Sequence, residues 1–571
     1  MIDPHKVFTD FFATKDRIVK AFIYQTSLGL NKGNICTTLD DVNNSIDNPY
    51  RSETDDIKYS IEENDLVAFD GEHKKPFVFL NGKFYLQKYF TYESNVLEDL
   101  YKRSSKNNFS SFNLDKWQKN KNDQQAVAVA LAQTGTLTII TGGPGTGKTT
   151  TVAKLLLSKL QSEPNLKIAL LAPTGKAVIR LAESLRNAQK NLNLTQEMDD
   201  LFDCISIKTI HSFLKKKVGY HPLDLDEARV VEEELIVVDE SSMVDLELMN
   251  DLLSTIPDST SLILLGDKNQ LSSVGAGSVF GDLCSSLQEP NSFSDSFLSK
   301  IKSPENEYSL PKANFLQDRI VELTKSHRFN AQDDIGQTSL AILKGETNII
   351  DQLVEDKKVQ VKLINEEKYF SVIDSFLDKM SIYTSKKTPK EALEVLNQYK
   401  ILCATNESII GVNGLNNYIQ ERLASLNKIK VSKHSPFYHN QPIMVTKNLY
   451  EFDIFNGDIG IVRETEQGDL NVYFEDGNLG IKELPVLALS HFELSFCMTI
   501  HKSQGSEFAN VLLAFPNNEI EFYTRELIYT GITRAKKSAI ILGDVDCLKN
   551  MISKSVKRVS GIKERIYNYG V

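Results

Sequence analysis

A glycine-rich segment between an apolar run and a helical pattern constrains the fold of this chain more than any other feature. Residues 142–149 read Gly-Gly-Pro-Gly-Thr-Gly-Lys-Thr, and the run Leu-Thr-Ile-Ile-Thr directly precedes them. This spacing matches G-x-x-x-x-G-K-[S/T], a loop whose backbone N–H groups cradle phosphates between a strand and a helix. Glycines let the backbone approach phosphate oxygens, and the helix N-terminus favours their negative charge. The segment therefore predicts a strand–loop–helix unit that binds a nucleoside triphosphate.

The residue types in this loop predict separate roles. The ammonium of Lys148 is expected to reach the β- and γ-phosphates, and the hydroxyl of Thr149 is expected to hold Mg²⁺. The other positions of the cradle are expected to line the nucleotide; they are Gly142, Gly143, Pro144, Gly145, Thr146, Gly147 and Thr150.

Two further apolar runs end in polar residues that suit the same chemistry. The run 234–238 is followed by Asp239, expected to hold Mg²⁺ through water, and Glu240, expected to orient and deprotonate the attacking water. The run 261–265 is followed by the turn Gly-Asp-Lys-Asn-Gln, which places Gln270 at the carboxyl edge of the predicted sheet. An amide at that edge can sense the γ-phosphate.

The spacing of apolar runs predicts the fold class. From about residue 123, short apolar runs alternate with amphipathic helical patterns, and a second such series follows residue 315. Buried strands that alternate with helices form parallel sheets covered on both faces. The expected class is α/β, with one lobe over 111–300 and a second over 315–571, joined by a polar loop at 284–314. Short strands with Gly and Asn turns predict a small β-barrel inserted at 428–492.

Residues 1–110 predict a separate, mainly helical module. Asn81-Gly82 separates the runs Pro-Phe-Val-Phe-Leu and Lys-Phe-Tyr-Leu-Gln, and Asn-Gly between such runs is a strong hairpin signal. The polar stretch 104–123 is expected to be a linker.

Composition limits the remaining possibilities. A net charge of −11 argues against binding nucleic acid through bulk positive charge, although a local basic groove would suffice. The six cysteines form no C-x-x-C pair, which gives zinc or disulfides little support and favours the cytoplasm. The opening residues lack the pattern of a secretory signal, and no apolar run reaches about 18 residues, so no membrane association is expected.

Two arginines extend the analysis beyond nucleotide binding. Arg328 lies in Lys-Ser-His-Arg-Phe and Arg534 in Tyr-Thr-Gly-Ile-Thr-Arg-Ala. A guanidinium delivered to the γ-phosphate from a second element accelerates phosphoryl transfer. If both side chains enter a cleft between the lobes, hydrolysis is coupled to lobe closure, whereas either arginine taken alone fits a surface ion pair.

At this point the motifs resemble those of a known family. The series GGPGTGKT, APTGKA, VVDESS, GDKNQLSSV, KSHRF, TIHKSQGSEF and YTGITRA resembles superfamily 1 helicases over roughly residues 122–544, and GGPGTGKTT, FNGDIG and HKSQGSEF resemble the RecD family of exodeoxyribonuclease V subunits. The resemblance implies two RecA-like lobes, ATP and Mg²⁺ as cofactors, and 5′-to-3′ travel on single-stranded DNA. It also implies RecB-like and RecC-like partner subunits in a heterotrimer that acts on duplex ends in double-strand break repair and recombination. Ser241 departs from the family pattern, which has alanine there.

The resemblance also implies roles for individual positions. Gln125 matches the glutamine that reads adenine, Arg328 and Arg534 match the arginines that approach the γ-phosphate, and Gly505 and Glu507 match nucleotide-side positions. The positions that match DNA-side motifs are Thr174, Gly175, Lys176, Thr209, His211, Thr499, His501, Lys502, Ser503 and Gln504.

Other functions remain open from the sequence. A stand-alone RecD-like helicase is usually longer and carries helix-hairpin-helix elements upstream, which are not evident here. A nuclease needs clustered carboxylates, and none stands out beyond Asp239 and Glu240. A regulatory ATPase or assembly subunit would suit residues 1–110, which carry no catalytic constellation and would dock on a RecC-like subunit by resemblance.

Overall fold

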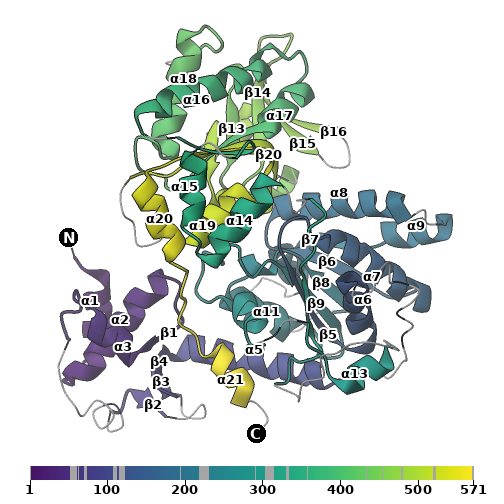
Figure 1. Cartoon of the computed structure of the whole chain (residues 1–571), viewed down its shortest axis with the longest axis vertical. Coiled ribbons are helices and arrows are strands. Elements are labelled where there is room, and N and C mark those ends of the chain that lie inside the picture. Colours follow the sequence, from purple (N-terminus) through teal and green to yellow (C-terminus); the bar gives the residue numbers. More distant parts are fainter. Residues whose placement is uncertain are drawn as a thin grey trace.

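The structure is a computed structural model in which a small N-terminal module and two α/β lobes lie against one another (Figure 1). It describes residues 2–51, 61, 64–69, 74–106, 112, 114, 117, 123–192, 195–217, 231–287, 289, 291–301, 314–328, 333–355, 358–364, 366–432, 434–452, 454–476, 480–517 and 523–568. Most of the predicted linker at 104–123 lies outside these residues.

The N-terminal module combines helices with a small sheet in the order β1-β4-β3-β2. Its elements are α1 (Pro4–Phe11), α2 (Arg17–Asn31), β1 (Cys36–Thr38), α3 (Leu39–Asn44), β2 (Val67–Ala68), β3 (Phe77–Leu80), β4 (Lys83–Leu86) and α5 (Gln87–Ser105). The predicted hairpin is confirmed, since β3 and β4 pair in antiparallel register. Asn81 and Gly82 both have positive φ, of 51° and 74°, as a two-residue turn that follows the strand twist requires.

The first lobe holds a six-stranded parallel sheet in the order β10-β5-β9-β8-β6-β7. Its strands are β5 (Leu137–Gly142), β6 (Ile168–Ala172), β7 (Ser206–Thr209), β8 (Leu235–Val238), β9 (Ser261–Gly266) and β10 (Ile320–Leu323). Its helices are α6 (Gln124–Thr134), α7 (Lys148–Ser162), α8 (Gly175–Leu192), α9 (Gln196–Asp203), α10 (Ile210–Lys217), α11 (Leu246–Thr255), α12 (Val279–Cys284) and α13 (Asp295–Lys300). Separate apolar clusters cover the two faces, which confirms the predicted strand–helix alternation.

The predicted boundary between the lobes was wrong. The loop expected at 284–314 contains α13, whose Phe297 is buried in the first lobe, and β10 pairs with β5 although it follows residue 315. A free edge beside the phosphate-binding strand would leave backbone groups and apolar surface unpaired, and the short run at 320–323 covers both. The first lobe therefore continues through β10 before the chain crosses over.

The second lobe holds a five-stranded parallel sheet in the order β11-β20-β19-β12-β18. Its strands are β11 (Val361–Ile364), β12 (Tyr399–Cys403), β18 (Cys497–Thr499), β19 (Phe508–Ala514) and β20 (Ala535–Leu542). Its helices are α14 (Asp334–Lys344), α15 (Asn348–Val354), α16 (Tyr369–Met380), α17 (Pro389–Gln398), α18 (Val412–Ser425), α19 (Arg525–Ile532) and α20 (Val545–Ser553).

An antiparallel sheet is inserted between α18 and β18, as the pattern of short strands predicted. Its order is β16-β15-β14-β13-β17, and its strands are β13 (Pro442–Val445), β14 (Ile459–Glu464), β15 (Leu470–Asp476), β16 (Gly480–Pro485) and β17 (Phe492–Leu494). The small β-barrel that was predicted here is an open sheet within the described part of the chain, because its edge strands β16 and β17 do not pair with each other.

The C-terminal segment leaves the second lobe and returns to the first lobe and the N-terminal module, ending in α21 (Ile562–Asn568) beside α5 (Figure 1). The backbone of Val559 hydrogen-bonds to Ile35 and Asn34, both at 3.0 Å. The predicted second lobe at 315–571 therefore also ends too late. Over the described residues, no helix has the length and apolar character that crossing a membrane requires.

Candidate nucleotide site between the lobes

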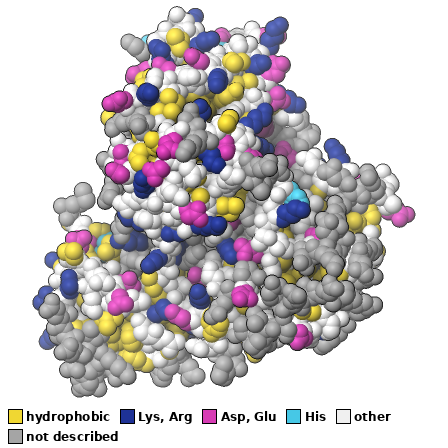
Figure 2. Space-filling view, in the orientation of Figure 1, with side chains coloured by type: hydrophobic (Ala, Val, Ile, Leu, Met, Phe, Trp, Pro, Cys, Tyr) yellow, Lys and Arg dark blue, Asp and Glu magenta, His cyan; other side chains and the backbone are white. Residues whose placement is uncertain are grey.

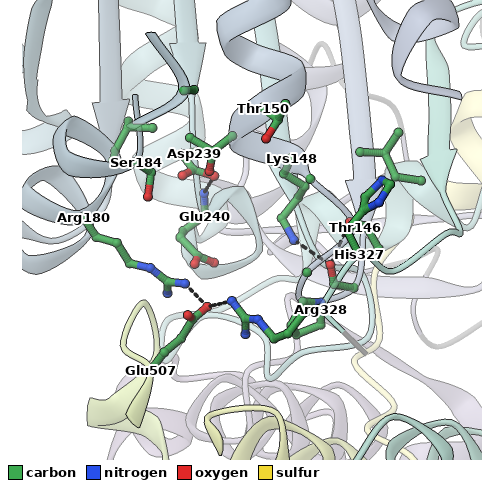
Figure 3. A pocket seen from close by; sticks show the side chains of 18 of the residues that line it. Thr146, Lys148, Thr150, Arg180, Ser184, Asp239, Glu240, His327, Arg328 and Glu507 are labelled. Atoms are coloured by element: carbon green, nitrogen blue, oxygen red, sulfur yellow. Dashed lines mark hydrogen bonds and ion pairs between the residues drawn. The ribbon is translucent and has the colours of Figure 1, made fainter. Parts of the chain in front are cut away.

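A cavity of about 860 Å³ opens where the carboxyl edge of the first sheet faces the second lobe. Most of the predicted nucleotide-side residues line it; they are Gln125, Gly143, Pro144, Gly145, Thr146, Gly147, Lys148, Thr149, Thr150, Asp239, Glu240, Gln270, Arg328, Gly505, Glu507 and Arg534. Gly142 lies just below, as the last residue of β5. Figure 3 shows Arg180 and Arg328 directed toward Glu507 from different elements, with Glu240 and Lys148 nearby.

The glycine-rich loop has the conformation that a phosphate cradle needs. Gly145 has a positive φ of 76°, and a Cβ there would lie 2.3 Å from the Cβ of Arg328, so only glycine fits. Lys148 begins α7 and its Nζ donates to the carbonyls of Gly142 at 2.6 Å and Gly143 at 3.3 Å. The loop backbone and the lysine ammonium therefore meet at the helix N-terminus, where an anion is favoured.

The predicted acidic pair forms the opposite wall of the cavity. Glu240 is a non-glycine residue with a φ of 51°, a strained conformation of the kind that collects at functional sites. Its N–H donates to Asp239 Oδ1 at 2.9 Å. Burial raises the pKa of Asp239 to about 6, and the charge of Glu240 adds to the shift. A divalent cation would relieve both effects, and Thr149 lines the same cavity, so these residues fit Mg²⁺.

Gln270 is buried at the edge of this wall, with 6% of its surface exposed. Its Nε2 donates to Asp267 Oδ2 at 3.2 Å, while its Oε1 is buried and has no hydrogen-bond partner among the described residues. The same Asp267 Oδ2 also accepts from the hydroxyl of Tyr529 in α19 at 2.9 Å. Gln270 Oε1 is thus a buried acceptor without a partner among the described residues, at the edge of the cavity.

The two predicted arginines reach the cavity from different lobes. Arg534 belongs to the second lobe, is 2% exposed, and donates to the carbonyls of Thr530 and Ser506, both at 3.1 Å. Arg328 follows β10 and packs over Gly145, so it belongs to the first lobe and not to the second as predicted. Burial, with the charges of Arg180 and Arg534, lowers the pKa of Arg328 to about 10.

A carboxylate that the sequence suggested only by resemblance joins the lobes. Glu507 of the second lobe accepts from the guanidinium groups of Arg180 and Arg328, and its Oε2 lies 3.2 Å from Lys536 Nζ (Figure 3). Arg180 also donates to the carbonyl of Gly505 at 3.0 Å. Sequence reasoning missed Arg180 and Lys536, because a single basic residue on an amphipathic helix or strand carries no local signal of a partner in another lobe.

Gln125, which by resemblance was expected to read adenine, lies against the loop. Its Nε2 donates to the carbonyl of Thr146 at 3.2 Å, and its Oε1 accepts from Lys154 Nζ at 2.9 Å. Lys154, on α7, was not predicted and fixes the amide at the rim of the cavity.

The predicted DNA-side residues divide into exposed and buried groups. His211, His501 and Lys502 are exposed. The hydroxyls of Thr174, Thr209 and Thr499 each accept a hydrogen bond from the backbone N–H three residues further along and so shape turns.

Ser503 and Gln504 differ from the prediction. Ser503 is fully buried and donates to the carbonyl of Ile500, and Gln504 donates across the lobes to the carbonyl of Leu271 at 2.9 Å. Their side chains therefore connect elements of the protein and present no surface to DNA in this conformation.

Gly175 is also covered, and Lys176 is partly buried. A Cβ on Gly175 would lie 2.4 Å from Phe455, which belongs to the inserted sheet region. Lys176 Nζ lies 5.7 Å from the ring centroid of Phe508, and burial lowers the pKa of this lysine to about 8. The inserted sheet thus packs on the segment that was expected to contact DNA.

Two sheets that face one cavity, one with a phosphate-binding loop and the other with a buried arginine, define a two-lobed P-loop nucleoside triphosphatase. The family model AAA domain matches residues 124–276, and the model UvrD-like helicase C-terminal domain matches residues 494–542.

The chain belongs to the RecD family. It is 33% identical over 514 residues to RecBCD enzyme subunit RecD of Buchnera aphidicola subsp. Acyrthosiphon pisum, covering 86% of this chain and 84% of that protein. RecBCD enzyme subunit RecD of Haemophilus influenzae is 34% identical, covering 77% of this chain and 72% of its own length. The ATP-dependent RecD2 DNA helicase of Deinococcus radiodurans is 27% identical, and the match covers 74% of this chain but 49% of that protein. Among solved structures, Bacteroides Pif1 bound to single-stranded DNA is 17% identical with a TM-score of 0.40, over 77% of this chain and 95% of that one.

Proposed function

We propose that this chain is the RecD-type motor subunit of a RecBCD-type helicase–nuclease, which uses ATP to move 5′ to 3′ along single-stranded DNA. Its family makes it an ATP-dependent DNA helicase. The observation that carries the proposal is that Lys148 of the first lobe and Arg534 of the second line one cavity. A nucleotide bound there touches both lobes, so hydrolysis can change their separation.

The residues of the cavity divide the chemistry between them. The loop and Lys148 would bind the β- and γ-phosphates, and Thr149 with Asp239 would hold Mg²⁺. The ion, when bound, neutralises charge that develops between these phosphates. Glu240 would orient the attacking water and take up its proton, and the amide of Gln270, which lines the cavity, would sense the γ-phosphate.

Contacts beside Gln270 couple the cavity to the second lobe. The next residue, Leu271, donates its N–H to Thr530 Oγ1 at 3.1 Å and accepts from Gln504 at 2.9 Å. A change at Gln270 is thereby passed to the segment that also carries the exposed His501 and Lys502. These two side chains are our candidates for a grip on the sugar–phosphate backbone, which would make movement independent of base sequence.

The surface charge agrees with a local rather than a general attraction to DNA. Figure 2 shows basic and acidic side chains interspersed over the visible face, in keeping with the net charge of −11. We propose that residues 1–110 dock on a RecC-like subunit in the cytoplasm and that nuclease activity belongs to a RecB-like partner. Asp239 and Glu240 line the nucleotide cavity, so we assign this acidic pair to ATP hydrolysis and not to cleavage of DNA.

The function is tested by ATP turnover with and without single-stranded DNA, for the purified chain and for its complex. DNA should stimulate turnover, and Lys148→Gln should abolish it while the circular dichroism spectrum stays unchanged. Polarity is tested with duplexes carrying a 5′ or a 3′ single-stranded tail, of which only the first should be unwound. Turnover indifferent to DNA in both settings would contradict the motor assignment.

Partner docking is tested by co-purification. Deleting residues 1–86, which leaves α5 in the first-lobe core, should release the chain from two larger subunits while ATP binding is retained. A complex that survives the deletion would contradict the docking role.

A further inference from the structure

Four charged side chains meet at one edge of the cavity and form what we call the Glu507 cluster: Arg180, Arg328, Glu507 and Lys536. The Glu507 side chain is 10% exposed, whereas Arg180, Arg328 and Lys536 are 34%, 23% and 53% exposed. One carboxylate therefore lies deeper than the three cations that surround it.

The cluster spans the two lobes. Arg180 comes from α8 and Arg328 from the segment after β10, both in the first lobe. Glu507 precedes β19 and Lys536 lies in β20, both in the second lobe. The carboxylate of one lobe thus holds two guanidinium groups of the other, and the ion pairs help to set the distance between lobes.

Positive charge remains in excess at this edge. Arg180, Arg328 and Lys536 each form an ion pair with Glu507, and the buried guanidinium of Arg534 is close enough to act on Arg328. Arg328 also packs over Gly145 in the phosphate cradle, next to Lys148. Guanidinium groups bind carboxylates and phosphates with the same forked geometry, so a phosphate that enters here competes directly with Glu507.

We propose that Glu507 is a positioning residue that holds Arg180 and Arg328 across the cleft when no nucleotide is present and yields them to the terminal phosphate of ATP. The exchange replaces a direct lobe-to-lobe ion pair by contacts made through the nucleotide. ADP lacks the terminal phosphate, so the ion pairs of Glu507 with the two arginines form again after hydrolysis and phosphate release. The inference rests on the proposed function, since it assigns the trigger for lobe movement in that same cavity.

The proposal predicts a change in nucleotide preference. In Glu507→Gln the competing charge is gone, so an ATP analogue that is not hydrolysed, adenylyl imidodiphosphate, should bind more tightly. ADP offers no terminal phosphate to Arg180 or Arg328, so its affinity should change little. A partly buried ion pair of this kind leads us to expect a rise of roughly fivefold in the analogue-to-ADP affinity ratio.

The measurement is isothermal titration calorimetry with Mg²⁺ on the full chain, alone or in complex with its partner subunits. Glu247→Gln is the matched control, because Glu247 pairs with Lys88 at 2.9 Å on the exposed surface away from the cavity. Its affinity ratio should equal that of the unmodified protein. Glu507→Asp keeps the negative charge but has a shorter side chain, so it should raise the analogue-to-ADP affinity ratio by a smaller factor. This variant provides the test if Glu507→Gln does not fold.

The outcomes separate the proposal from its alternatives. A raised ratio in Glu507→Gln and Glu507→Asp supports the exchange. Equal weakening of both nucleotides would overturn it and would point to a contact with the base or sugar that they share. An unchanged ratio would overturn it as well. DNA-stimulated turnover by the unmodified protein tests the motor function separately, so an unchanged ratio in an active motor rejects the exchange alone.

Discussion

Replacing Arg565 by methionine is expected to release the C-terminal segment from the body of the protein. Glu93 in α5 is fully buried and accepts from Arg565 at 3.0 Å, from the N–H of Gly561 at 3.0 Å and from the Tyr85 hydroxyl at 3.3 Å. Methionine keeps the length of the apolar stem but removes the guanidinium, which also lies 5.0 Å from the centroid of the Phe90 ring. The substitution therefore leaves a buried carboxylate without its cation.

The cost follows from the burial of the pair. Breaking a buried ion pair from one side costs about 3–5 kcal/mol, and we take the lower end because Arg565 is 16% exposed. About 3 kcal/mol is roughly 100-fold in the equilibrium between the docked and released segment. Hydrogen exchange of the amides in residues 558–568 should accelerate by that factor.

The pH dependence of the effect has a definite sign. Burial raises the pKa of Glu93 above its usual 4.5, and loss of Arg565 raises that pKa further. The docked state then binds more protons than the released one, so docking weakens as pH rises above the unfolded pKa. The defect should shrink when the pH is lowered from about 8 to about 5.5.

Two controls complete the test. Lys549→Met removes an ion pair with Asp351 that is largely exposed and should change exchange little. Adding Glu93→Gln to Arg565→Met should restore much of the docking, because the unpaired charge is gone. Unchanged exchange in Arg565→Met, or a defect that grows at low pH, would refute the reasoning.

Further predictions concern the covered DNA-side segment and the metal site. Phe455→Ala should uncover the backbone of Gly175 and tighten binding of single-stranded DNA by roughly threefold, measured by fluorescence anisotropy, because a phosphate can then approach the segment that carries Lys176; unchanged affinity would mean that this segment does not reach DNA. With its pKa at about 6, Asp239 should lose its charge as pH falls below that value, so the Mg²⁺ concentration for half-maximal turnover should rise by about tenfold per pH unit there. A requirement for Mg²⁺ that is flat from about pH 7 to about pH 5 would contradict this role of Asp239.

The features that were predicted correctly from the sequence are those that a short stretch of chain determines. The phosphate-binding loop, the acidic pair after β8 and the Asn81-Gly82 hairpin depend on neighbours within a few residues, and the structure has each of them at the expected place. The β10 strand was missed because four residues after a polar loop carry little signal, and its pairing with β5 is decided by a free sheet edge far away in sequence.

The predictions that failed concern residues whose positions are set by contacts between the two lobes. Gln504 was expected to face DNA, but its position is fixed by Leu271 in the other lobe. Arg180 resembles any exposed basic residue of an amphipathic helix until Glu507 is placed beside it. Such pairings are not encoded in local periodicity, because they follow from how two separately folded sheets come together.

The most direct test of the central claim is the DNA-stimulated turnover number of Arg534→Ala together with its affinity for adenylyl imidodiphosphate. If Arg534 faces the phosphates bound at Lys148 across the cavity, turnover should fall by about a thousandfold or more while the analogue still binds. Turnover within a few-fold of the unmodified protein would contradict a shared site, and the two lobes would then not act on one nucleotide.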